Sequence, residues 1–111
     1  MALTIGLRGT ASTTVTPEKT AAACGSGSLP VFGTPFLLAL MEEATCNAVS
    51  DALEDGQSTV GVSMDIRHSA PSPVGMEVRA EATLTEAADS TGRSAFSWVS
   101  RAVLSPGICN L

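Results

Sequence analysis

The chain has 111 residues, enough for one domain but not for two lobes that close over a cleft. Hydrophobic residues make up 44% of the sequence and charged residues 15%, which is typical of a folded domain rather than a disordered segment. The net charge is -5, the six basic residues are scattered, and aromatic residues reach only 4%. Because nucleic-acid binding relies on clustered cations and stacking rings, we expect no nucleic-acid partner.

Histidine and cysteine are sparse. The single histidine is His68, and the cysteines Cys24, Cys46 and Cys109 form no C-x-x-C spacing, so we expect no metal site and interpret the thiols as core fillers. The longest apolar run, residues 36–41, is far shorter than the ~20 residues that cross a bilayer. An odd cysteine count and no recognisable secretory segment lead us to expect a cytoplasmic protein with no membrane partner.

The first third of the chain predicts one strand and one loop. Residues 7–16 are rich in Thr and Val with rough alternation and end at Pro17, which favours a strand. Residues 21–30 contain the sequence Gly-Ser-Gly-Ser and end at Pro30, which indicates an irregular loop.

Thr34 and Pro35 then mark a helix start, because Thr can cap free N–H groups and Pro loses no hydrogen bond at the first helical position. The predicted helix covers residues 34–53. A helical period of about 100° places one set of residues toward solvent: Glu43, Asn47, Ser50 and Glu54. The opposite set faces a core: Leu37, Met41, Ala44, Ala48 and Ala52. Glu42 falls outside the solvent set, on an apolar flank.

The rest of the chain alternates with the period of strands. Residues 60–66 predict a half-buried strand that points His68 inward, and Met76 to Leu84 form the clearest alternation in the chain. A turn at residues 89–92 and a last strand at 93–103 follow. This order predicts an α+β domain in which an antiparallel sheet packs on one long helix.

Four residues could carry chemistry: Thr34, Glu42, Gly61 and His68. Each also has a structural interpretation, namely a helix cap for Thr34, a snorkelling surface carboxylate for Glu42, a bulge or close contact for Gly61, and a satisfied or partly exposed side chain for His68. Taken together, a carboxylate on the helix and an imidazole on the covering strand could act as an acid/base pair around a water molecule.

These residues lie in segments that resemble a known family. The segments are Val31-Phe32-Gly33-Thr34-Pro35, Leu40-Met41-Glu42, Thr59-Val60-Gly61-Val62, His68, and the turn from Pro71 to Met76. They resemble the hot-dog-fold thioesterases, in particular the subgroup similar to fluoroacetyl-CoA thioesterase, from about residue 7 to residue 93. The resemblance implies a curved antiparallel sheet wrapped around one long helix, a homodimer, and hydrolysis of a small or short-chain acyl-CoA without a cofactor.

The resemblance also implies roles for the four residues. Glu42 would be the catalytic carboxylate, either activating water or attacking the thioester carbonyl itself. His68 would orient the water or protonate the departing thiolate, and Thr34 would hydrogen-bond within this group. Gly61 would bind substrate by offering its backbone N–H to the thioester oxygen, where the missing side chain allows a close approach.

The chain departs from the family pattern in two places. The Gly-Ser-Gly-Ser sequence at residues 25–28 lacks the bulky apolar residues of fluoroacetyl-specific relatives, which argues against that specificity. Residues 93–111 of this single predicted domain (1–111) depart further, since Ser105-Pro106-Gly107 interrupts where the family has another strand. We therefore expect the C-terminal strand to be missing, and a non-catalytic domain that binds acyl-CoA or another partner stays open as an alternative.

Overall fold

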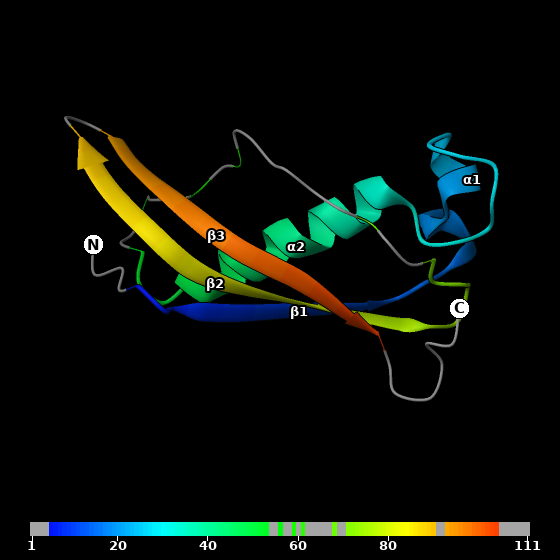
Figure 1. The fold of residues 1–111 in the computed structure, drawn as a ribbon, viewed down its shortest axis with the longest axis horizontal. Coiled ribbons are helices and arrows are strands. Elements are labelled where there is room, and N and C mark those ends of the chain that lie inside the picture. The colour runs from blue at the N-terminus through cyan, green and yellow to red at the C-terminus, as the bar shows by residue number, and fades with distance from the viewer. Residues whose placement is uncertain are drawn as a thin grey trace.

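The computed structural model describes residues 5–53, 56, 59, 61, 68, 71–90 and 93–104, with residues 87–104 described through their backbone. Its elements are β1 (Arg8–Thr14), the 3-10 helix η1 (Pro17–Lys19), α1 (Ala21–Cys24), α2 (Thr34–Val49), β2 (Glu77–Ser90) and β3 (Arg93–Leu104). The strands form an antiparallel sheet in the order β1-β2-β3. Figure 1 shows α2 lying along one face of this long, twisted sheet, as the sequence predicted for an α+β domain.

The alternation in the β2 segment is confirmed. The five residues expected to face the core, from Met76 to Leu84, are at most 1% exposed. β1 alternates between exposed and half-buried residues along its whole length, because its inner side chains pack toward α2 and its outer ones face solvent. In the described part of the sheet, β1 is an edge strand, paired only with β2.

The inward face of α2 is also confirmed at Leu37, Met41, Ala44 and Ala48, which are all buried. The helix is shorter than expected, however, and ends at Val49 rather than at residue 53. The Ser50 hydroxyl donates to the Asn47 carbonyl, and residues 51–53 form a turn in which the N–H groups of Ala52 and Leu53 both donate to the Val49 carbonyl. Ala52 consequently lies past the helix and is only half-buried.

The interpretation of Thr34 as a helix cap is wrong. Gly33 occupies the N-cap position in an extended conformation (φ -74°, ψ 140°), and no side chain caps the helix there. Thr34 is the first helical residue, followed by Pro35, whose missing N–H costs nothing in the first turn. The Thr34 hydroxyl is therefore free for another partner.

One glycine allows β1 and α2 to touch. A Cβ atom at Gly9 would collide with the Ala44 carbonyl oxygen and with the backbone N and Cα of Ala48. The strand and the helix thus meet backbone to backbone at this crossing, which only glycine permits. The core continues from this crossing through buried side chains of α2, β2 and the segments that flank α1: Val15, Phe32, Leu37, Leu40, Met41, Ala44, Val78, Ala80 and Ala82.

The structure corrects three further expectations. Residues 21–24 form one turn of α-helix, capped by the Thr20 side chain and ended by Gly25 with φ 76°, rather than irregular loop. Residues 89 and 90, expected in a turn, belong to β2, which continues to Ser90, and the rest of the expected turn lies outside the described residues. Cys24 and Cys46 are exposed free thiols and not core fillers, and Cys109 lies outside the described residues.

The last strand is confirmed, as β3. The pairing of β2 with β3 shifts register between Leu84 and Glu86, which marks a β-bulge or irregularity in the ladder at that point. The strand expected at residues 60–66 and the family's C-terminal strand, which was expected to be missing, both fall on residues outside the described ones. In the described part of the chain, no helix is long and apolar enough to cross a membrane.

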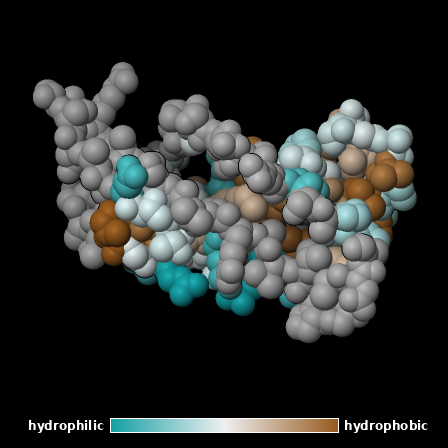
Figure 2. Space-filling model, in the orientation of Figure 1, coloured by the Kyte–Doolittle hydropathy of each residue, from teal (hydrophilic) through white to brown (hydrophobic). Residues whose placement is uncertain are grey.

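Exposed apolar surface gathers near α1. Figure 2 shows hydrophobic surface at the end of the molecule that carries this helix. Leu29, which follows α1, is 62% exposed and is the most exposed of the described large hydrophobic residues. The segment around α1 is therefore not closed over by the described part of this chain.

Candidate active site

The first half of the candidate site lies at the start of α2. Thr34 Oγ1 and His68 Nδ1 are 2.8 Å apart, a hydrogen-bond distance, and both residues are half-buried. Because Gly33 takes the N-cap position, the Thr34 hydroxyl can serve the imidazole instead of the helix. When that hydroxyl donates to Nδ1, the ring proton is held on Nε2, which leaves an N–H donor pointing away from the helix start.

The second half lies two turns further along α2. Glu42 is half-buried, and its Oε2 atom would be only 2.5 Å from a Cβ atom built on Gly61. The carboxylate therefore occupies the space that any other residue at position 61 would fill with its side chain. Gly61 itself is exposed, so its backbone can be approached from outside.

The two halves are separate within one chain. Thr34 and Glu42 are eight residues apart on α2, which corresponds to about 12 Å along the helix axis. In the described part of the chain, no hydrogen bond or ion pair joins Glu42 to Thr34 or His68. The structure thus places all four expected residues where α2 contacts the described residues Gly61 and His68, but as two pairs.

A third contact, which the sequence analysis did not single out, continues this row. Cys46 Sγ lies 3.8 Å from Thr59 Oγ1. Cys46 is one helical turn beyond Glu42, and Thr59 is two residues before Gly61. The sequence does indicate that Cys46 lies beside Glu42, because residues four apart share a helix face. Their contacts with Thr59 and Gly61 could not be inferred from spacing.

Cys24 lies at the other end of α2. Its sulfur would be 3.3 Å from a Cβ atom on Gly33, so the thiol packs beside the residue that precedes Thr34. The Cys24 thiol donates a hydrogen bond to Ser26 Oγ, and the interaction of the two side chains lowers the pKa of the Cys24 thiol. This thiol is fully exposed and belongs to the edge of the site rather than to its interior.

This arrangement can support water activation and acyl transfer. A half-buried carboxylate can act as a base or a nucleophile, and a histidine whose Nδ1 is hydrogen-bonded can donate or accept a proton at Nε2. An accessible backbone N–H beside the carboxylate can stabilise an oxyanion. No three metal-ligating side chains lie together among the described residues.

One helix packed on an antiparallel sheet, with a carboxylate and an imidazole along the same side of that helix, defines the class of hot-dog-fold thioesterases. The chain belongs to the fluoroacetyl-CoA-specific thioesterase family, whose model matches residues 15–102.

Individual relatives agree with this assignment. A fluoroacetyl-CoA thioesterase from Streptantibioticus cattleyicolor is 37% identical over 54 residues, which cover 49% of this chain and 39% of that protein. The crystal structure of a mutant of the fluoroacetyl-CoA-specific thioesterase FlK, in complex with fluoroacetate and CoA, superposes with a TM-score of 0.79 at 28% identity, covering 91% of this chain and 82% of that one. A thioesterase-superfamily protein from Thermus thermophilus gives a TM-score of 0.75 at 26% identity over 93% and 77% of the two chains.

Proposed function

We propose that this protein hydrolyses the thioester bond of a small or short-chain acyl-CoA to the free acid and CoA. Family membership and the likeness to the FlK complex with fluoroacetate and CoA support the reaction class. The observation that carries the proposal is the position of the Glu42 carboxylate against Gly61. The carboxylate thereby lies against an exposed glycine, whose backbone N–H is our candidate for binding the thioester oxygen during attack on the carbonyl.

Glu42 acts on the thioester carbonyl in this proposal. Either it takes a proton from the attacking water, or it attacks the carbonyl carbon itself and the resulting anhydride is then hydrolysed. In both cases the Gly61 N–H stabilises the negative charge that develops on the thioester oxygen, an interaction whose loss typically costs about 10²–10³ in rate. The missing side chain of Gly61 is what allows the Glu42 carboxylate to lie against the backbone that carries this N–H.

His68 acts at the leaving group or the water. With Thr34 donating to Nδ1, the proton on Nε2 can be hydrogen-bonded to the water or passed to the departing thiolate. Because a thiol has an ordinary pKa of about 8.5, its thiolate leaves without full protonation, and we expect His68 to contribute less than Glu42.

The proposed active form is a homodimer. The backbones of Thr34 and Glu42 are about 12 Å apart along the axis of α2, and among the described residues no hydrogen bond joins Glu42 to the Thr34–His68 pair. A second copy that packs on the α2 side bearing these residues brings Glu42 of one subunit to the Thr34–His68 pair of the other. The exposed free thiols Cys24 and Cys46 are compatible with the expected cytoplasmic location.

The proposal is tested by CoA release from a panel that contains acetyl-CoA, fluoroacetyl-CoA and longer acyl-CoAs. We expect turnover of the short acyl groups and a loss of at least about 10³-fold in kcat for Glu42→Gln. Glu43→Gln is the matched control, because Glu43 is the next residue of α2 and is exposed on another face. Binding of acyl-CoA without turnover, or equal activity in both variants, would contradict the proposal.

A further inference from the structure

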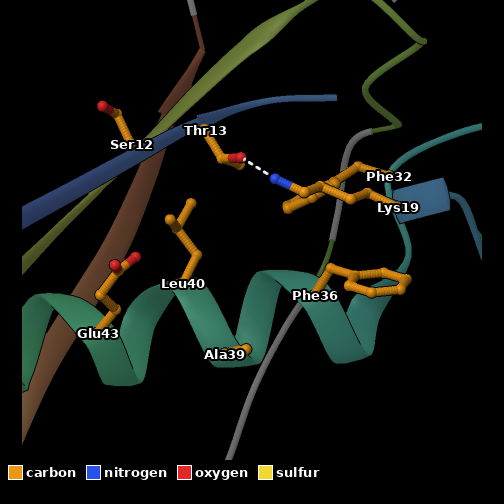
Figure 3. Close-up of a pocket in the computed structure, with 8 residues that line it drawn as sticks. All are labelled: Ser12, Thr13, Lys19, Phe32, Phe36, Ala39, Leu40 and Glu43. Carbon is orange, nitrogen blue, oxygen red and sulfur yellow. Dashed lines mark hydrogen bonds between the residues drawn. The ribbon is translucent and has the colours of Figure 1, made fainter. Parts of the chain in front are cut away.

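A pocket of about 490 Å³ lies between β1 and α2, on a part of the molecule that the proposed reaction does not use. Figure 3 shows Leu40 and Glu43 pointing from α2 toward β1, with Lys19 reaching across to Thr13. The lining comes from β1, η1, α2 and Phe32, which lies just before α2, and comprises Ser12, Thr13, Lys19, Phe32, Phe36, Ala39, Leu40 and Glu43. The volume is within the range of small-molecule sites in proteins.

This pocket is distinct from the candidate active site. Its helical residues Phe36, Leu40 and Glu43 are spaced by three and four residues and therefore share one face of α2. At 100° per residue, Thr34 lies about 120–180° around the helix from these three residues and Glu42 about 100–160°, and neither residue lines the pocket. The helix itself thus separates the two sites, and a ligand in this pocket contacts neither Glu42 nor Gly61.

One end of the pocket carries an available positive charge. Lys19 is half-buried and its ammonium group donates one hydrogen bond, to Thr13 Oγ1, which leaves two of its three donors. In the described part of the chain, no carboxylate forms an ion pair with Lys19. An anionic group beside Lys19 can also be hydrogen-bonded by the Thr13 hydroxyl, which points into the same pocket, whereas the neighbouring Ser12 side chain points to the other face of β1 (Figure 3).

The middle of the pocket and its end near Glu43 determine which body the anionic ligand can have. Phe36 and Leu40 provide an apolar wall, with Phe32 behind them at a ring-centroid distance of 6.4 Å from Phe36. Glu43 lies at the opposite end from Lys19 (Figure 3), seven residues or about 10 Å along α2 from Phe36. Its carboxylate repels a second negative charge at that end.

We infer that this pocket binds a small carboxylic acid with an apolar body, whose carboxylate pairs with Lys19 and whose body packs on Phe36 and Leu40. Selectivity for a single negative charge follows from Glu43. The site needs no turnover of an acyl-CoA, so it stands or falls independently of the proposed function.

Benzoate, titrated into the wild-type protein and followed by NMR, is a suitable probe. We expect shift changes at Thr13, Ala39 and Leu40, and at least about ten-fold weaker binding of the neutral analogue benzamide, which cannot form the charged hydrogen bond. Terephthalate, which places a second carboxylate near Glu43, should also bind more weakly than benzoate. Shift changes centred on Gly61 and His68, or equal binding of benzoate and benzamide, would overturn the assignment.

Two variants with the same change of charge locate the cation. Lys19→Met should weaken benzoate binding at least about ten-fold, whereas Arg8→Met should leave it within about two-fold. Arg8 is the matched control because it lies on β1 outside the pocket, where its 68%-exposed side chain pairs with Glu81. A cooperative thermal transition checks that the Lys19→Met protein is folded. If this variant does not fold, the comparison of benzoate with benzamide on the wild-type protein tests whether the pocket recognises the negative charge. Equal affinity in the two variants would contradict a role for Lys19.

Discussion

Gly61 illustrates how one missing side chain can determine the position of a reacting group. In Gly61→Ala the new Cβ atom meets only Glu42 Oε2, the end of a flexible side chain, so the carboxylate can move away. We expect the free energy of unfolding to change by less than about 1 kcal/mol. We expect kcat to fall by about 10²-fold, because displacing a reacting group by about 1 Å is enough for such a loss.

Steady-state kinetics and thermal unfolding of the Gly61→Ala protein measure these two effects separately. Gly27→Ala is the control, since its Cβ atom would make an ordinary 3.4 Å contact with Ala21 Cβ in an exposed segment. Full activity in Gly61→Ala would remove the reason for placing the thioester oxygen beside this backbone.

Thr34 permits a similar test of the difference between a cap and a catalytic hydroxyl. Thr34→Val keeps the shape and removes the hydrogen bond to His68, whereas Thr34→Ser keeps the hydroxyl. We expect Val to lower kcat about ten-fold and Ser to retain most of the activity. Because Gly33 holds the N-cap position, we expect Val to cost less than the roughly 1 kcal/mol lost with a helix cap.

Chemical denaturation of both Thr34 variants supplies the second readout. A loss of stability near 1 kcal/mol with unchanged kcat would return Thr34 to a structural role.

At the scale of secondary-structure elements, the crossing of β1 over α2 depends on Gly9. Unlike Gly61, this glycine faces backbone atoms of Ala44 and Ala48, which cannot move unless the helix separates from the sheet. We expect Gly9→Ala to lower the free energy of unfolding by about 2–3 kcal/mol, the upper part of the range for overpacked cores. Denaturant unfolding would measure this loss, and Gly27→Ala again serves as the control. A loss below about 0.5 kcal/mol would show that the two backbones do not pack this tightly.

The elements that the sequence predicts well are those whose own side chains decide their environment. From Met76 to Leu84 every second residue is apolar, and the inward face of α2 repeats with the helical period, so each pattern needs only one buried face to be interpretable. Helix ends were less predictable. Thr34 and Gly33 are both acceptable caps by residue type, and only the distant His68 explains why the hydroxyl is engaged elsewhere.

The exposure of the thiols could not be predicted from the local sequence either. Cys46 lies on the helix flank shared with Glu42, and whether that flank is buried depends on what covers it rather than on the helix sequence. The pocket at Lys19 was not predicted either, because its lining combines β1, η1 and α2 and each segment alone has an ordinary composition.

At the scale of the whole molecule, the site residues are distributed over two distant segments whose contacts no local pattern contains. The resemblance to the thioesterase family identified Thr34, Glu42, Gly61 and His68 together, and the structure adds that they form two pairs. In the proposed homodimer, the separation of about 12 Å along α2 between Thr34 and Glu42 has the consequence that each site combines Glu42 of one chain with the Thr34–His68 pair of the other.

Complementation between inactive variants tests that consequence. Glu42→Gln and His68→Ala are each expected to be inactive or nearly so as homodimers, because every site then lacks one group. If each site combines Glu42 of one subunit with His68 of the other, a mixed dimer contains one site with both groups intact. Equal amounts of the two variants, unfolded and refolded together, should then recover about a quarter of the wild-type activity, since about half of the dimers are mixed and each has one working site of two. The two variants mixed without refolding serve as the control for subunit exchange. If mass measurement detects mixed dimers but no activity is recovered, the whole site lies within one chain.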